Sequence, residues 1–263
     1  MSQMNVDFGV LTETKVTGGV YPRAFEDYKI VATNAASPHQ GGVALFYREK
    51  SCFQLESIRR WGHNVVSFVV STGKRRLGFL GAYIPPADTT TIPHIQKALD
   101  YIPDVFPTFF LGDLNANLRS PGDARDAEIA ALVTARGLQD TRPHFWQRSS
   151  YLGWNTWFQG RQLGRVQSTC DYILATDRQV LHNVQAKQPR LHTSDHVMLL
   201  GCFWSASQTA NARYLKRRKR FPLTPPKSMD KGEGDKLINE LKTFIEPGSH
   251  QKRACHAWVS EKT

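Results

Sequence analysis

The chain has few cysteines and no long apolar run, and both absences exclude classes of protein. Its four cysteines are widely spaced along 263 residues and include no Cys-x-x-Cys pair, which argues against a disulfide framework and a sulfur-ligated zinc site. The spacing of His250, Cys255 and His256 fits no zinc finger. No apolar run reaches the length of a membrane span, and no signal segment follows Met1. We therefore expect an intracellular protein with reduced thiols and no membrane partner.

Acidic residues are scarce relative to basic ones, and the imbalance is greatest near the C-terminus. The net charge is +11, and residues 213–263 contain thirteen Lys and Arg against six Asp and Glu. Such a tail predicts a polyanionic partner, with nucleic acid ahead of membrane because no apolar face accompanies the charges. The alternative is a solvated tail that repels itself. The basic run 213–220 also resembles a nuclear address, which predicts a nuclear location.

A change of composition after Ala206 predicts two parts. Residues 1–206 contain strand-like and helical patterns, which predict an α/β domain. Residues 207–263 are basic and contain Pro and Gly, so we expect a largely flexible linker or tail with a short helix over 236–245.

Within the first part, strand patterns outnumber helical ones. The strand-like runs are 6–13, 28–33, 43–47, 65–71, 77–84, the apolar start of 108–117, 151–158, 166–174 and 197–204. Runs 65–71 and 77–84 are predicted to form a hairpin, as are 151–158 and 166–174. A helix is expected over 92–106, and a second is expected to begin at Asp123 or Asp126 and to end at Gly137.

The stretch 108–117 contains the main candidates for catalysis, because an apolar strand there ends in polar side chains. Asp113, Asn115 and Asn117 alternate after Gly112, so continued strand geometry would place all three on one side. A carboxylate beside carboxamides can hold a metal ion or orient a water. The alternative is a polar loop in which Asp and Asn bond to their own backbone.

Several blocks in sequence order resemble a known superfamily. They are Leu11-Thr12-Glu13, Gly41-Gly42-Val43, Gly81-Ala82-Tyr83 before Pro85-Pro86, Gly112-Asp113-Leu114-Asn115, Ser168-x-x-Asp171-Tyr172 and Ser194-Asp195-His196. The set resembles the endonuclease/exonuclease/phosphatase superfamily, which includes deoxyribonuclease I. Within it, the three blocks that begin at Leu11, Gly41 and Gly81 most resemble the endonuclease domains of non-LTR retrotransposons. The resemblance implies a four-layer sandwich of two packed mixed β-sheets flanked by helices. Residues 258–263 resemble the linker that leads to a reverse transcriptase, which would follow in a full-length element.

The resemblance also implies a role for each site residue. The residues assigned to catalysis are Tyr83, Asp113, Asn115, Asp171 and His196. Glu13 and Asp195 are assigned to metal binding, with Mg²⁺ as the expected ion and Mn²⁺ as the alternative. Asn117, Trp157 and Ser194 are assigned to substrate binding. The implied activity is metal-dependent nicking of DNA. The alternatives are a catalytically silent remnant that binds nucleic acid, and a hydrolase acting on a small phosphate ester.

Two departures from the superfamily pattern stand out. Cys170 occupies a position where members usually have an aliphatic residue. Members also begin with a strand that carries a metal-site Asn, whereas Glu13 lies too close to Met1 for such a strand to precede it. We therefore expect an N-terminally shortened domain with one ligand missing and one sheet edge unpaired.

Overall fold

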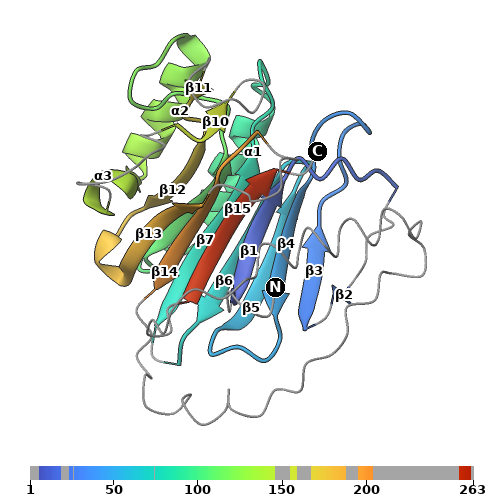
Figure 1. Ribbon diagram of the computed structural model, residues 1–263, viewed down its shortest axis with the longest axis vertical. Helices are drawn as coiled ribbons and strands as arrows, with labels where there is room; N and C mark the ends of the chain where they lie inside the picture. The colour runs from blue at the N-terminus through green and yellow to red at the C-terminus, as the bar shows by residue number, and fades with distance from the viewer. Residues whose placement is uncertain are drawn as a thin grey trace.

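The computed structural model describes residues 6–18, 24–25, 27–73, 75–145, 155–158, 167–187, 195–203 and 255–261. These residues form an α/β fold with two large sheets and a small one (Figure 1). None of the helices in these ranges is long and apolar enough to cross a membrane.

The first large sheet has seven strands in the order β13-β14-β15-β1-β4-β3-β2. Their bounds are β1 Phe8–Thr12, β2 Ala24–Phe25, β3 Tyr28–Ala32, β4 Val43–Arg48, β13 Leu181–Lys187, β14 Met198–Phe203 and β15 Cys255–Glu261. The predicted strands at 6–13, 28–33, 43–47 and 197–204 correspond to β1, β3, β4 and β14.

The second large sheet has six strands in the order β5-β6-β7-β8-β12-β9. Their bounds are β5 Gln54–Trp61, β6 Val65–Ser71, β7 Arg76–Tyr83, β8 Thr108–Asp113, β9 Gln139–Asp140 and β12 Asp171–Ala175. Strands β6 and β7 form the predicted antiparallel hairpin. Strands β7 and β8 are parallel, so the sheet is mixed.

Aromatic side chains of the two large sheets contact one another in one hydrophobic cluster. The centroid of the Phe8 ring in β1 lies 4.8 Å from the centroid of the Phe79 ring in β7. Phe203 of β14 lies 4.9 Å from Phe109 of β8, and both rings are buried. Rings at these distances in edge-to-face geometry stabilise a core beyond their buried area. This cluster holds the polar ends of β1, β7, β8 and β12 in place.

Helices pack on the other face of the six-stranded sheet. Helix α1 (Thr91–Tyr101) buries Ile92 and Ile95 there, and α2 (Ala124–Ala135) buries Ile129. A third helix, α3, covers Arg142–Phe145, and a 3₁₀ turn, η2, covers Arg178–Val180.

The predicted helix boundaries are confirmed at α2 and corrected at α1. Asp123 caps α2 by accepting a hydrogen bond from the Asp126 backbone N–H, and Gly137 has a φ of +63° just after its end. Helix α1 ends at Tyr101 rather than near 106. Ile102 is extended, with a ψ of 122°, because it precedes Pro103 and a residue before proline avoids helical geometry.

The predicted hairpin of 151–158 with 166–174 is wrong in its second half. Among the described residues of this stretch, β10 (Trp157–Phe158) and β11 (Gln167–Ser168) pair as a separate two-stranded sheet. From Asp171 the chain enters the six-stranded sheet as β12, between β8 and β9. A local pattern of β-branched and aromatic residues does not specify the partner strand.

The expected unpaired edge beside β1 is also wrong. Strand β15 lies between β14 and β1, where Figure 1 shows it in red. It pairs in parallel with β1, with Val259 beside Val10, and antiparallel with β14, with Val259 beside Leu199. A C-terminal strand therefore completes the centre of the sheet. The remainder of 207–263, including the helix predicted over 236–245, lies outside the described residues.

Candidate active site

Three site residues lie in one row across neighbouring strands of the six-stranded sheet. Tyr83 of β7 is in register with Asp113 of β8, and Asp113 is in register with Asp171 of β12. Gly112 permits this approach, because its φ is +155° and a Cβ atom there would lie 1.8 Å from the Ala82 carbonyl oxygen. The close packing of β7 and β8 therefore requires glycine immediately before the central carboxylate.

Asp113 is held by the turn that follows it. Strand β8 ends at Asp113, and Asn115 has a φ of +45°, so the predicted alternation through Asn117 does not continue. Asn115 nevertheless donates to the Asp113 carboxylate from its backbone N–H at 2.9 Å and from its side-chain amide at 3.2 Å. Asp113 is 1% exposed. Asn115 therefore orients this buried carboxylate through a turn rather than along a strand.

Glu13 reaches the same region from the end of β1. Its carboxylate accepts a hydrogen bond from the Tyr83 hydroxyl at 2.5 Å and pairs with the Lys15 ammonium at 3.1 Å. Glu13 and Lys15 have φ values of +52° and +54°. This left-handed conformation is strained for residues other than glycine, and strained backbone of this kind is found most often at functional sites. The carboxylate oxygens of Glu13 are hard donors that suit Mg²⁺. The Lys15 ammonium offsets their negative charge.

His196 and Asp171 form a buried pair. The Nδ1 atom of His196 lies 2.9 Å from Oδ2 of Asp171, and the two residues are 6% and 0% exposed. An ionised carboxylate only accepts, so this contact places a proton on Nδ1. The other oxygen of Asp171, Oδ1, is buried and has no hydrogen-bond partner among the described residues.

Cys170 lies against this pair. Its Sγ atom is 3.5 Å from Asp171 Oδ2 and 3.9 Å from His196 Nδ1. Burial, together with the charges of Asp171 and Asp113, raises the pKa of the Cys170 thiol well above its usual value. Donor atoms of Asp113, Cys170, Asp171 and His196 all lie within 4.8 Å of one another. The sequence singled out Cys170 as a departure, but not as a neighbour of the histidine.

Of the residues assigned to substrate and metal binding, Trp157 and Asp195 lie together beside His196, whereas the side chain of Asn117 makes local contacts in its own loop. The indole N–H of Trp157 donates to Asp195 at 2.8 Å, and Trp157 forms a β-bridge with His196. Asn117 is exposed and accepts hydrogen bonds from the backbone N–H groups of Arg119 and Ser120, as the polar-loop alternative describes. Ser194 lies outside the described residues.

Sequence reasoning missed Arg125, which lies on α2 and joins the loops after β7 and β8. Its guanidinium donates to the carbonyl oxygens of Asn115 at 2.9 Å, Leu114 at 3.1 Å and Pro85 at 3.1 Å. A planar fork of donors suits several carbonyls at once. No sequence motif marks this position.

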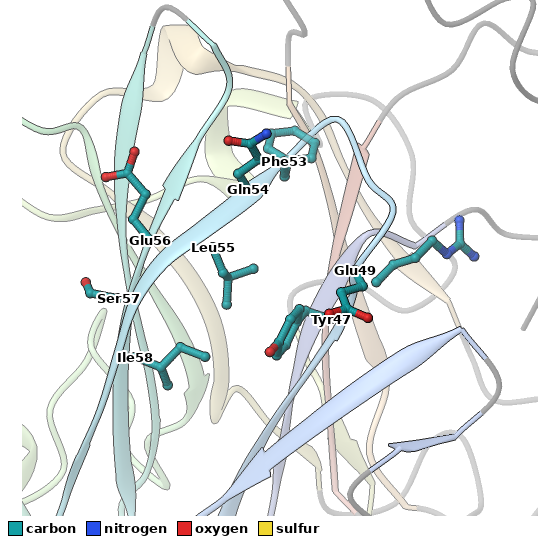
Figure 2. A pocket seen from close by; sticks show the side chains of 9 residues that line it. Tyr47, Glu49, Phe53, Gln54, Leu55, Glu56, Ser57 and Ile58 are labelled. Atoms are coloured by element: carbon teal, nitrogen blue, oxygen red, sulfur yellow. The ribbon is translucent and has the colours of Figure 1, made fainter.

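A hollow at the edge of the six-stranded sheet contains none of the assigned residues. It has a volume of about 530 Å³ and lies where β5 approaches the end of β4. Figure 2 shows Leu55 and Ile58 of β5 and Tyr47 of β4 pointing toward one another there. Its lining offers no cluster of metal-ligating groups.

Several solved structures share this fold, although no curated protein sequence matches the chain. An AP endonuclease from Archaeoglobus fulgidus has a similar structure, with a TM-score of 0.57 and 17% identity, over 75% of this chain and 88% of its own. The endonuclease domain of TRAS1, a telomere-specific non-LTR retrotransposon, gives 0.54 and 16% over 73% and 83%. An AP endonuclease from Leishmania major gives 0.57 and 14% over 73% and 76%. At these identities the likeness shows the fold.

A match to a family profile goes further than these structures. The profile described as Endonuclease/Exonuclease/phosphatase family matches residues 1–196, which is most of the chain. This range includes β1, β7, β8 and β12, together with His196. The chain therefore belongs to the Endonuclease/Exonuclease/phosphatase family.

Proposed function

We propose that the chain hydrolyses phosphodiester bonds of DNA with the help of a divalent metal ion, and so nicks duplex DNA. The observation that carries this proposal is the buried cluster of Asp113, Asp171 and His196 beside Tyr83, which is hydrogen-bonded to Glu13. Hydrolysis of a phosphodiester needs an oriented water and stabilisation of negative charge on the phosphate. These side chains offer both.

Each residue has a proposed task. Asp113, fixed by Asn115, orients the attacking water. His196 donates a hydrogen bond to the phosphate, and Asp171 keeps the proton on its Nδ1 atom. Glu13 would hold Mg²⁺ or Mn²⁺, with Asp195 near a second ion or the leaving group, and a bound ion would supply charge neutralisation. Trp157, Asn117 and Ser194 are proposed to contact the nucleic acid.

Different observations support DNA as the proposed substrate and a retroelement as the proposed origin. The net charge of +11 favours a polyanion, and several similar structures are endonucleases by name. The sequence blocks support derivation from a retroelement endonuclease with a reverse transcriptase downstream in the full element. A four-layer sandwich, a domain boundary near 206 and a nuclear location belong to the same proposal.

A second candidate function is nucleic-acid binding without cleavage. Strand β15 lies beside β1, where the superfamily resemblance leads us to expect an N-terminal strand with a metal-site Asn, and β15 contains no Asn. Loss of one such group costs about 10²–10³ in rate. Hydrolysis of a small phosphate ester is the third alternative.

One experiment separates these functions. Purified protein is incubated with supercoiled plasmid in Mg²⁺ or in chelator, beside Asp113→Ala and a control, Asp100→Ala, which replaces an exposed acid on α1. Nicking that requires Mg²⁺, survives in the control and falls at least about 10²-fold in Asp113→Ala supports the proposal. A salt-sensitive gel shift without nicking supports the second candidate. Release of inorganic phosphate from an inositol phosphate, with intact plasmid, supports the third.

A further inference from the structure

We propose that Asp113, Cys170, Asp171 and His196 bind one Zn²⁺ ion, and that this ion inhibits the hydrolysis proposed above. The inhibition depends on that proposed function, whereas the binding does not. The four residues come from the end of β8, the start of β12 with the residue before it, and the residues leading into β14. They therefore converge only in the folded chain.

The spacing of the donor atoms fits a tetrahedral ion. All four residues offer a ligand atom within 4.8 Å of the others. Ligand atoms around a zinc ion with bonds of about 2.0–2.3 Å lie roughly 3.3–3.8 Å apart. Cys170 Sγ and His196 Nδ1, at 3.9 Å, are already close to that separation. Small side-chain adjustments would complete the site.

The chemistry of the donors favours zinc over magnesium. A thiolate, an imidazole and two carboxylates are all ligands that zinc accepts, whereas Mg²⁺ prefers oxygen ligands and keeps several waters. All four residues are buried, which leaves little room for a hydration shell. Glu13, with its Tyr83 and Lys15 contacts, is the harder oxygen site. The two ions would therefore prefer different parts of one active site.

The charge and hydrogen bonding of the cluster give a second, independent observation. Asp171 is fully buried, yet its Oδ1 atom has no hydrogen-bond partner within the described part of the chain. An unpartnered buried carboxylate oxygen is costly, and a cation is one of the few groups that can satisfy it. Asp113 is also buried and in register beside Asp171. A divalent cation would offset both charges.

Zinc binding would disable the pair that the hydrolysis uses. To ligate the ion, the Cys170 thiol and His196 Nδ1 each release a proton to solvent. The hydrogen bond from His196 to Asp171 is then broken, and both side chains are held by the ion instead of the phosphate. Inhibition should not be relieved by more Mg²⁺ at Glu13.

Binding is tested first, without DNA and without Mg²⁺. Zn²⁺ is titrated into the full chain by calorimetry, and Co²⁺ is followed by absorption, because a thiolate ligand gives a charge-transfer band and a tetrahedral site gives strong visible bands. We expect one site. Cys170→Ala should lose the charge-transfer band and at least about tenfold in Zn²⁺ affinity. Removing a side chain that only hydrogen-bonds to a metal ligand already costs about tenfold or more. Two control variants should retain the band and the affinity. They are Cys202→Ala, which replaces a buried cysteine of β14, and Cys255→Ala in β15.

The native chain keeps the proposal falsifiable if Cys170→Ala does not fold. Absence of a cobalt–thiolate band in the native chain, or its loss in Cys255→Ala, would overturn the zinc site. Inhibition is tested separately by adding Zn²⁺ to nicking reactions at fixed Mg²⁺. The native chain should be inhibited at lower Zn²⁺ than Cys170→Ala. If zinc binds as proposed but no nicking occurs in any condition, the proposed function fails and the metal site stands.

Discussion

At the scale of single residues, the hydrogen bond between His196 and Asp171 gives the sharpest prediction. Asp171→Asn should lower the single-turnover nicking rate by about 10²–10⁴-fold, the usual contribution of acid–base groups, because a neutral amide no longer stabilises the proton on His196. The free energy of unfolding in chelator should fall by no more than about 1–3 kcal/mol, because the amide removes a buried charge beside Asp113 but leaves a buried N–H without a partner. Urea unfolding and quenched-flow nicking measure the two effects. A loss of stability that accounts for the loss of rate would indicate a structural pair only.

The different burial of Cys170 and Cys52 predicts how fast each cysteine reacts. The thiolate is the form of cysteine that attacks alkylating agents. Burial raises the pKa of the Cys170 thiol, so at about pH 8 it stays protonated as well as inaccessible. Cys52 is half-buried and should be modified at least about tenfold faster by iodoacetamide. Peptide mass spectrometry of the folded chain measures both sites. Denaturant should make the two rates similar, and fast labelling of Cys170 without it would contradict the burial.

At the scale of elements, the start of α1 depends on one carboxylate. Asp88 accepts hydrogen bonds from the Thr90 backbone N–H and hydroxyl, each at 2.7 Å, and from the Thr91 hydroxyl at 2.5 Å. Burial alone would raise the pKa of Asp88, but these hydrogen bonds and Arg125 outweigh it and lower the pKa. Asp88→Ala should reduce the free energy of unfolding by about 1 kcal/mol at pH 7, the usual net contribution of a hydrogen bond.

The effect of Asp88 should depend on pH in one direction. A lowered pKa in the folded state means that the stabilisation is present above the unfolded value of about 3.9 and is lost as pH falls through the folded value. The difference between native and Asp88→Ala, measured by urea unfolding, should therefore shrink below about pH 4. Asp104→Ala removes an exposed acid as the control. A difference that grows in acid would contradict the assignment.

Strand β15 is the other element whose contribution can be tested. It pairs with β1 on one side and β14 on the other, so Val259→Pro removes a donor from the centre of the sheet. Each buried backbone group left unpaired costs about 1–3 kcal/mol, and the urea midpoint should fall accordingly. His250→Pro, outside the strand, is the control. If both variants unfold like the native chain, β15 does not belong to the stable sheet.

These elements also show what a sequence can predict. The hairpin of β6 and β7 and the capped helix α2 were predictable because their signals are local: a turn between two apolar runs, and an Asp and a Gly at the helix ends. Strand β15 was not, because its partner β1 lies about 250 residues away along the chain, and nothing local specifies such a pairing. The same limit separates Asp113 and His196, found through motifs, from Arg125, whose five carbonyl partners come together only after folding.

At the scale of the whole molecule, the site is assembled from segments far apart in the sequence. Glu13 follows β1, Asp113 ends β8 and His196 precedes β14, and the strands between them hold these groups through one aromatic core. No single segment contains the chemistry. Substrate attraction, in contrast, is a property of net charge and does not require a defined fold.

This separation predicts that DNA affinity and cleavage can be changed independently. Replacing the five basic residues 216–220 with Gln removes charge from a region that the sequence alone marks as cationic. Affinity for duplex DNA should fall, and the slope of log affinity against log salt should become shallower by about 0.9 for each phosphate that the protein no longer neutralises. The nicking rate at saturating DNA should be unchanged, because none of these residues is assigned to catalysis or to metal binding. Lys97→Gln, an exposed cation on α1, is the matched control, and its slope should change by at most about 0.9. An unchanged slope in the five-residue variant would mean that the body of the protein, rather than this run, holds the phosphates.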